Sequence, residues 1–157
     1  MAEPFGIATG VLQVAGIGAE LGSALWKCSN DIPHAHRDIG EIAAEVRHTS
    51  NVVGSIGSLL AQQDASEKSG TATFTDEARS CLRDRLKDCQ SAFFQLDEAL
   101  RSARQPLGYR KLAISGRWKW PLSKATTVAL QGKLKGLTAL LSLMLQVLDL
   151  ARKTEEW

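Results

Sequence analysis

The stretch LRDRLKDCQSAFFQLDEAL, residues 82–100, decides the fold of this 157-residue chain. Its apolar side chains recur at alternating intervals of four and three residues: Leu82, Leu86, Cys89, Phe93, Leu96 and Leu100. That spacing places them on one face of an α-helix, with charged residues over much of the opposite face. Since a helix with one apolar stripe needs other helices to cover it, the stretch predicts a member of a helical bundle.

Two capping residues mark where helices begin. Thr75 is a suitable N-cap for the helix of residues 82–100, which we expect to continue to about Arg104. Ser123 can cap a last helix that runs to about Lys153. Within that last helix, residues 137–148 are apolar on nearly every face, which predicts the central helix of the bundle.

Two earlier helices are expected, over residues 4–30 and 33–63. In the second of them the apolar positions step by three, four or seven residues: Ile39, Ile42, Val46, Val53, Ile56 and Leu60. Residues 109–122 have room for a short helix, and no strand-like alternation is present. We therefore predict that residues 1–157 form a single all-α domain, a four- to five-helix bundle with long antiparallel helices.

Charge is distributed unevenly along the chain. Residues 1–100 carry 8 Lys+Arg and 14 Asp+Glu, whereas residues 101–153 carry 11 Lys+Arg and a single acid, Asp149. A basic segment of this kind favours an anionic partner, such as phospholipid head groups, nucleic acid or an acidic protein surface. The alternative is that it pairs with the acidic first part of the chain inside the fold.

Residues that could support catalysis or metal binding are sparse. The three cysteines, Cys28, Cys81 and Cys89, lack metal-ligand spacing and predict reduced thiols in a cytoplasmic protein. His34 and His36 are two residues apart, so they do not share a helix face. No nucleophile elbow, P-loop or zinc-protease motif is present. We expect no enzyme activity, no cofactor and no metal.

The first segment that could carry function is FGIATGVLQVAGIGAELGSALW, residues 5–26, which contains one charged side chain. It is long enough to cross a bilayer, and glycines four residues apart favour close helix–helix assembly in lipid. Its candidate insertion and assembly residues are Phe5, Gly6, Gly10, Val11, Leu12, Gly16, Gly18, Glu20, Leu21, Gly22 and Trp26. We expect Gly10→Leu or Gly18→Leu to keep the fold and abolish activity. The alternative is a buried helix whose small residues pack against its neighbours.

The second segment is YRKLAISGRWKWPLSK, residues 109–124, in which basic and aromatic residues alternate. Tryptophan and lysine together suit a membrane interface, and the same composition suits nucleic-acid bases and phosphates. The candidate lipid-binding residues are Tyr109, Arg110, Lys111, Arg117, Trp118, Lys119, Trp120 and Lys124. The alternative is that the tryptophans belong to the core.

Three parts of the chain resemble a known family: the opening residues 3–11, the turn at Asp31-Ile32-Pro33 with the helix after it, and residues 118–124 before a leucine-rich last helix. Together they resemble the HeLo-like domains of fungal NOD-like (STAND) receptors. That family is similar to the HeLo domain of fungal incompatibility proteins and to the four-helix bundle of the mixed-lineage kinase-like pseudokinase. The resemblance implies a bundle at the start of a larger receptor, followed by a NACHT or NB-ARC module, a lipase-like domain or an amyloid motif.

In those relatives, oligomerisation drives membrane association and permeabilisation, and the N-terminal helix is implicated. The resemblance therefore implies a cell-death effector in fungal innate immunity or heterokaryon incompatibility. Such a domain would be cytoplasmic at rest and would act at the plasma membrane, with anionic lipids and further copies of itself as partners. Residues 5–26 differ from a membrane-spanning helix in two respects: they include the charged Glu20, and their hydropathy is modest. The alternative is an adaptor that oligomerises or recruits a protein without contacting lipid; nucleic-acid binding is a weaker third hypothesis.

Overall fold

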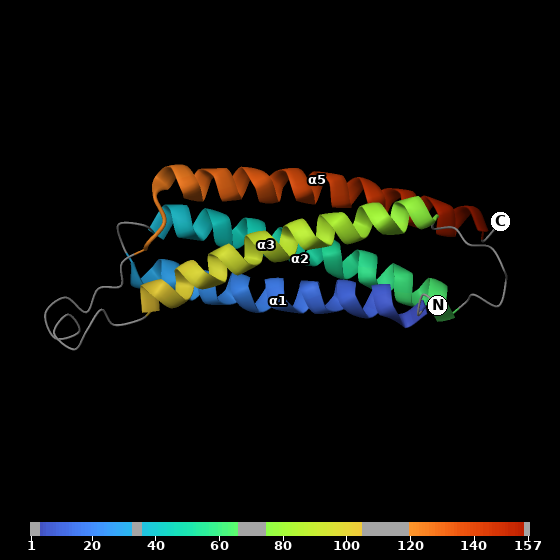
Figure 1. The fold of residues 1–157 in the computed structure, drawn as a ribbon, viewed down its shortest axis with the longest axis horizontal. Helices are drawn as coiled ribbons and strands as arrows, with labels where there is room; N and C mark the ends of the chain where they lie inside the picture. Colours follow the sequence, from blue (N-terminus) through green and yellow to red (C-terminus); the bar gives the residue numbers. More distant parts are fainter. Residues whose placement is uncertain (1–3, 33–35, 66–74, 105–119, 156–157) are drawn as a thin grey trace, which may run out of the picture.

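The described secondary structure consists of four long helices (Figure 1). The computed structural model describes residues 4–32, 36–65, 75–104 and 120–155. Within them the elements are α1 (Pro4–Asp31), α2 (His36–Ala65), α3 (Asp76–Arg104) and α5 (Lys124–Glu155), with no strand. The prediction of an all-α helical bundle is therefore confirmed for the described residues. Of the short helix expected within residues 109–122, only residues 120–122 are described, and they are not helical.

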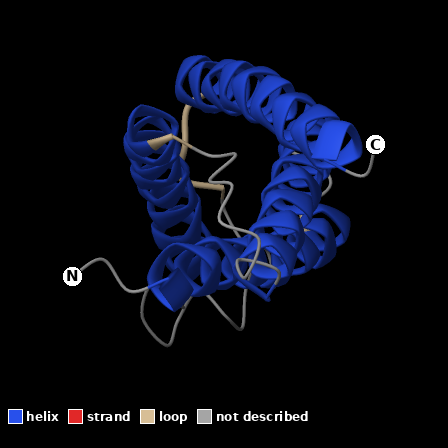
Figure 2. Cartoon of the chain, turned by 90° about the vertical axis from the view of Figure 1, so that its right-hand side faces the viewer, coloured by secondary structure: helices blue, strands red, loops and turns tan. Residues whose placement is uncertain are grey.

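The helices are arranged so that each packs on two others. α1 contacts α2 and α3, and α5 contacts the same two helices from the opposite side. Seen along the bundle, the four helices surround a common axis (Figure 2). α1 and α3 run in one direction, α2 and α5 in the other, and the start of α1 lies at the same end as the end of α5 (Figure 1).

The core is built from the predicted stripes. All six apolar positions of the 82–100 stretch are buried, as are the six that were predicted to line the second helix. The N-caps are also confirmed: Thr75 Oγ1 accepts a hydrogen bond from the Ala78 N–H at 3.1 Å, and Ser123 Oγ accepts one from the Thr126 N–H at 3.1 Å. These caps satisfy N–H groups that the first helical turn leaves without backbone partners.

The most extensive interface joins α1 to α2, and small residues make it close. The Ser50 hydroxyl of α2 donates a hydrogen bond to the backbone carbonyl of Ala15 in α1, at 2.5 Å. A Cβ added to Gly54 would lie 3.7 Å from the Ala15 Cβ, and one added to Gly57 would lie 2.8 Å from Leu12 Cδ2. Helices that approach this closely exclude large side chains from their shared surface.

The prediction that the last helix is central is wrong. α5 packs on α2 and α3 with one face, where Leu134, Leu141 and Leu148 are buried. Its opposite face is exposed, with Leu143 and Val147 at 58% and 63% of their full accessibility. A helix that is one of four around an axis can bury only about half of its circumference, and α5 is apolar on more than that half.

Candidate functional site

The candidate residues of α1 divide between the inside and the outside of the bundle. Val11, Leu21, Gly18 and Gly22 are buried, whereas Leu12, Gly16, Glu20 and Trp26 are exposed and Gly10 is intermediate. Other exposed positions of α1 include Thr9, Gln13, Ile17, Ala19, Ser23 and Lys27. Phe5 and Gly6 belong to α1, and their exposure lies outside what the structure describes. Most of the apolar side of α1 therefore faces its neighbours, whereas Leu12, Ile17 and Trp26 are exposed.

The glycines of α1 serve two different purposes. A Cβ added at Gly18 would lie 2.9 Å from Phe93 Cε2 and 3.0 Å from Ser50 Cβ, and one at Gly22 would meet the Arg47 Cγ at 2.5 Å. Gly10 and Gly16 have no such neighbour within 4 Å. Gly18 and Gly22 are thus required by packing inside the bundle, so Gly18→Leu is not expected to keep the fold as the sequence suggested. Gly10 and Gly16 leave open space along α1.

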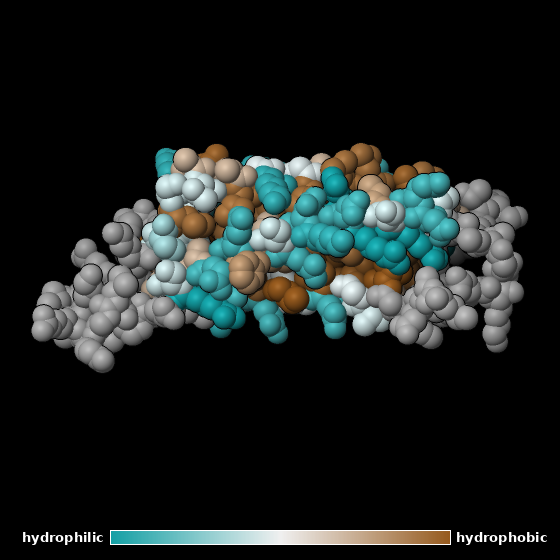
Figure 3. Space-filling view, viewed as in Figure 1, coloured by the Kyte–Doolittle hydropathy of each residue, from teal (hydrophilic) through white to brown (hydrophobic). Residues whose placement is uncertain are grey.

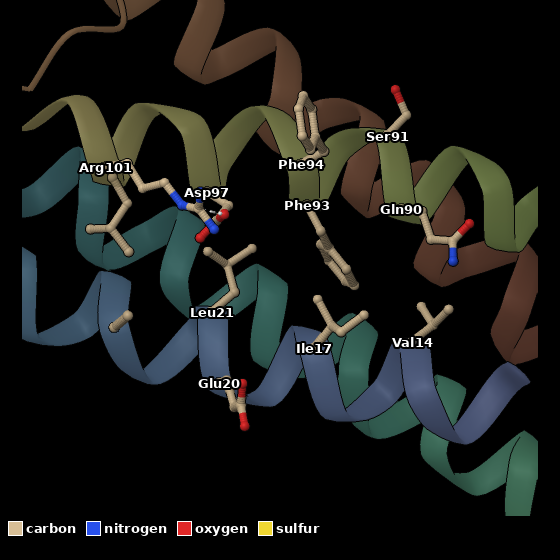
Figure 4. A pocket seen from close by; sticks show the side chains of 12 residues that line it. Val14, Ile17, Glu20, Leu21, Gln90, Ser91, Phe93, Phe94, Asp97 and Arg101 are labelled. Carbon is tan, nitrogen blue, oxygen red and sulfur yellow. Dashed lines mark ion pairs between the residues drawn. The ribbon is translucent and has the colours of Figure 1, made fainter. Parts of the chain in front are cut away.

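A groove of about 710 Å³ lies between α1 and α3 (Figure 4). Val14, Ile17 and Leu21 point from α1 toward Phe93 of α3, and the Phe94 ring points the other way. Ile17 and Phe94 are 52% and 64% exposed. Polar and charged residues also line the groove, including Glu20, Gln90, Asp97 and Arg101, and the Asp97 carboxylate forms an ion pair with Arg101 Nε at 3.1 Å. The groove is therefore apolar at its base and charged at its rim.

The basic aromatic segment is described only at its end. Tyr109, Arg110, Lys111, Arg117, Trp118 and Lys119 lie outside the described residues. Trp120 is buried, and its Nε1–H donates a hydrogen bond to Thr127 Oγ1 at 3.3 Å. Lys124 is exposed at the start of α5. Trp120 therefore anchors the entry to α5 in the core and is not at a surface in this conformation.

The outer face of α5 is a feature that the sequence reasoning missed. Five large apolar side chains are exposed there: Val128, Leu140, Leu143, Val147 and Leu150. Brown, apolar atoms gather over the C-terminal half of α5 along the upper edge of the molecule (Figure 3). The signal in the sequence is the apolar character of nearly every face of residues 137–148, which predicts a central helix where the structure has an exposed face.

Titratable groups of the described residues form no recognisable reaction centre. No group of three or more His, Cys, Asp or Glu side chains that could hold a metal ion occurs in that part of the chain. Burial, together with the neighbouring Asp88 carboxylate, raises the pKa of the Cys89 thiol to about 11. Cys28 is buried as well, whereas Cys81 is exposed. His36 Nδ1 lies 2.8 Å from the backbone carbonyl oxygen of Ser29, so it has a structural contact.

Two helices of the described chain have the length and mean hydropathy of a membrane span. They are the stretch Ile7–Asp31 in α1, with a value of 1.2, and Lys124–Lys153 in α5, with a value of 1.5. The core helices of soluble proteins also pass this criterion. The more apolar of the two helices is the less buried one, since 28% of its most apolar stretch is buried in α5 against 44% in α1.

Comparisons with family models, with curated proteins and with solved structures find no match for this chain.

Proposed function

We propose that this domain is a membrane-targeting effector that permeabilises membranes after it is clustered, with α1 as the inserting helix. The observation that carries the proposal is the pair of long apolar helices, α1 and α5, in a domain whose core needs only one face of each. The resemblance to HeLo-like domains of fungal receptors implies that permeabilisation leads to cell death. It also implies that a downstream oligomerising module clusters the domain and so raises its local concentration.

Water and lipid have opposite effects on α1. In water, α1 contributes Val11, Val14, Leu21 and Leu25 to the core. Each such side chain stabilises the fold by about 1.5–3 kcal/mol, so together they rival the ~5–15 kcal/mol stability of a whole domain. α1 therefore stays in the bundle unless lipid takes up the same side chains.

Dye release from liposomes tests the proposal. Purified protein, alone and fused to an inducible oligomerisation domain, is added to vesicles with and without anionic lipid. We expect release that requires both clustering and anionic lipid. Retention of the dye under every condition, with the folded bundle confirmed by circular dichroism, would contradict a permeabilising function.

The groove between α1 and α3 supports a second candidate, an adaptor that binds a protein helix. Ile17 and Phe94 could cover the apolar face of such a helix, and Glu20, Asp97 and Arg101 could pair with its charged edges. This candidate predicts a stable complex in solution without vesicle binding. Substituting Phe94 with Asp would weaken that complex and would leave vesicle leakage unchanged.

A further inference from the structure

The outer face of α5 is an uncharged strip that extends over most of the helix. Its C-terminal half presents Leu140, Leu143, Val147 and Leu150, which are 46%, 58%, 63% and 64% exposed. Small or apolar exposed residues continue the strip toward the N-terminus: Ala125, Val128, Ala129, Gly132, Gly136 and Ala139. Single exposed apolar side chains are ordinary. From position 128 to 150, at 1.5 Å per residue, the strip is about 33 Å long. An uncharged strip of this length is typical of a surface that binds a membrane or another molecule.

The core does not require these side chains. The face of α5 that packs on α2 and α3 already has its own buried residues, including Leu134, Leu141 and Leu148. Gly132 and Gly136 have nothing within 4 Å of the place where a Cβ would stand, so no contact inside the described bundle needs a glycine there. The outer strip is therefore additional to what folding demands.

Lysines border the strip on both sides. At 100° per residue, Lys133 and Lys135 lie about 80° to either side of the line through Leu143, and both are exposed. Between Lys124 and Lys153 the helix carries five basic residues and one acid, Asp149. That acid is already paired with Lys153 at 3.1 Å and Arg152 at 3.5 Å. An apolar strip with cationic edges is the pattern of a helix that lies in the plane of an anionic membrane surface.

We infer that the closed bundle first contacts anionic lipid through the outer face of α5, before α1 leaves its place. Leu140, Leu143 and Val147 enter the boundary between head groups and acyl chains, and Lys133 and Lys135 lie against lipid phosphates. This inference rests on the proposed membrane function and assigns its docking step to α5. The outer face of α1 suits that step less well, because Thr9, Gln13, Glu20 and Lys27 interrupt its exposed apolar residues Leu12, Ile17 and Trp26.

A second copy of this chain fits the same strip less well. Two copies paired through α5 would bring lysine-bordered edges together, and like charges at close range oppose association. Asp149, the one acid between Lys124 and Lys153, already pairs within its own helix. An anionic surface supplies the charge that a second copy lacks.

Vesicle flotation with matched variants of the full chain tests the inference. The apolar variant combines Leu143→Gln with Val147→Gln, and the charge variant combines Lys133→Gln with Lys135→Gln. Their controls make the same kinds of change on α3: Phe94→Gln, and Arg83→Gln with Lys87→Gln. All seven side chains are exposed, so each protein is expected to fold.

With vesicles that contain phosphatidylserine, we expect about tenfold weaker partitioning of the apolar variant and roughly 30-fold weaker partitioning of the charge variant. Both controls should partition like the wild type. Wild-type binding that neither α5 variant reduces would overturn the inference and leave the membrane function standing. Absence of wild-type binding to any vesicle would overturn both. A wild-type dimer in solution that the apolar variant dissociates would assign the strip to self-association and overturn lipid docking.

Discussion

At the scale of single residues, neighbouring glycines of α1 have opposite roles that composition alone does not reveal. Gly16 faces open space, and Gly18, two residues later, is pressed between the Phe93 ring and the Ser50 side chain. Both belong to the same small-residue pattern in the sequence. The difference arises only from where α2 and α3 pack, so it could not be predicted before their positions were known.

Alanine substitutions at these two positions should change stability in opposite directions. Gly16→Ala should raise the free energy of unfolding by about 0.5–1 kcal/mol, because alanine restricts the unfolded chain and favours the helix. Gly18→Ala should lower it by about 1–3 kcal/mol, because the new methyl group would overlap the buried Phe93 ring. Urea denaturation measures both. Equal effects of the two substitutions would be inconsistent with the packing described.

The cysteines provide a second prediction at this scale. At pH 8, a thiol reagent should modify Cys81 in the native protein, and Cys89 should react only after unfolding, because Cys89 is buried and its pKa is raised to about 11. A raised pKa in the folded state also means that folding favours the protonated thiol. Its contribution to stability is complete below pH 9 and is lost as the pH rises toward 11.

The pH dependence has a direct control. The unfolding free energy of Cys89→Ala should fall less steeply between pH 9 and pH 11 than that of the wild type, when both are measured in urea. The same slope in the two proteins would show that Cys89 does not titrate as described. Modification of Cys89 at the rate of Cys81 at pH 8 would also contradict its burial.

At the scale of elements, periodicity predicted the helices well and their positions in the bundle poorly. The stripe of α3 and the caps Thr75 and Ser123 were evident in the sequence because each depends only on local spacing. The position of α5 in the bundle was not evident in the sequence, because an apolar helix can lie at the centre of a bundle or at its edge with one apolar face exposed. Deciding between the two requires knowledge of how many neighbours cover it.

α1 offers an element-scale prediction about assembly. Leucine at Gly10 meets open space in the closed bundle, so Gly10→Leu should keep the wild-type unfolding free energy to within about 1 kcal/mol. If copies of α1 associate in lipid through Gly6 and Gly10, the same change should abolish clustered dye release.

Thr9→Leu is the matched control, since it adds bulk at the adjacent exposed position of α1. It should leave dye release unchanged. If the Gly10→Leu variant released as much dye as the wild type, assembly through Gly6 and Gly10 would be excluded. That result would not bear on the insertion of α1 itself.

At the scale of the whole molecule, the bundle divides into strongly and weakly joined parts. α1 and α2 share the most extensive and closest interface, whereas α3 has the slightest contacts with its two neighbours and borders the groove of Figure 4. Insertion of α1 must therefore break its contact with α2, including the hydrogen bond from Ser50 to the Ala15 carbonyl. We expect lipid to drive that separation after α5 has docked.

A reversible disulfide between α1 and α2 tests this separation most directly. The Ala15 Cβ lies 3.7 Å from the place of a Cβ at Gly54, which is within the range that a disulfide spans. Ala15→Cys with Gly54→Cys, in a Cys81→Ser background, should join the helices when oxidised. We predict that the clustered, oxidised protein binds anionic vesicles without releasing dye, and that reduction restores release. Equal dye release before and after reduction would contradict the claim that α1 leaves α2 to permeabilise the membrane.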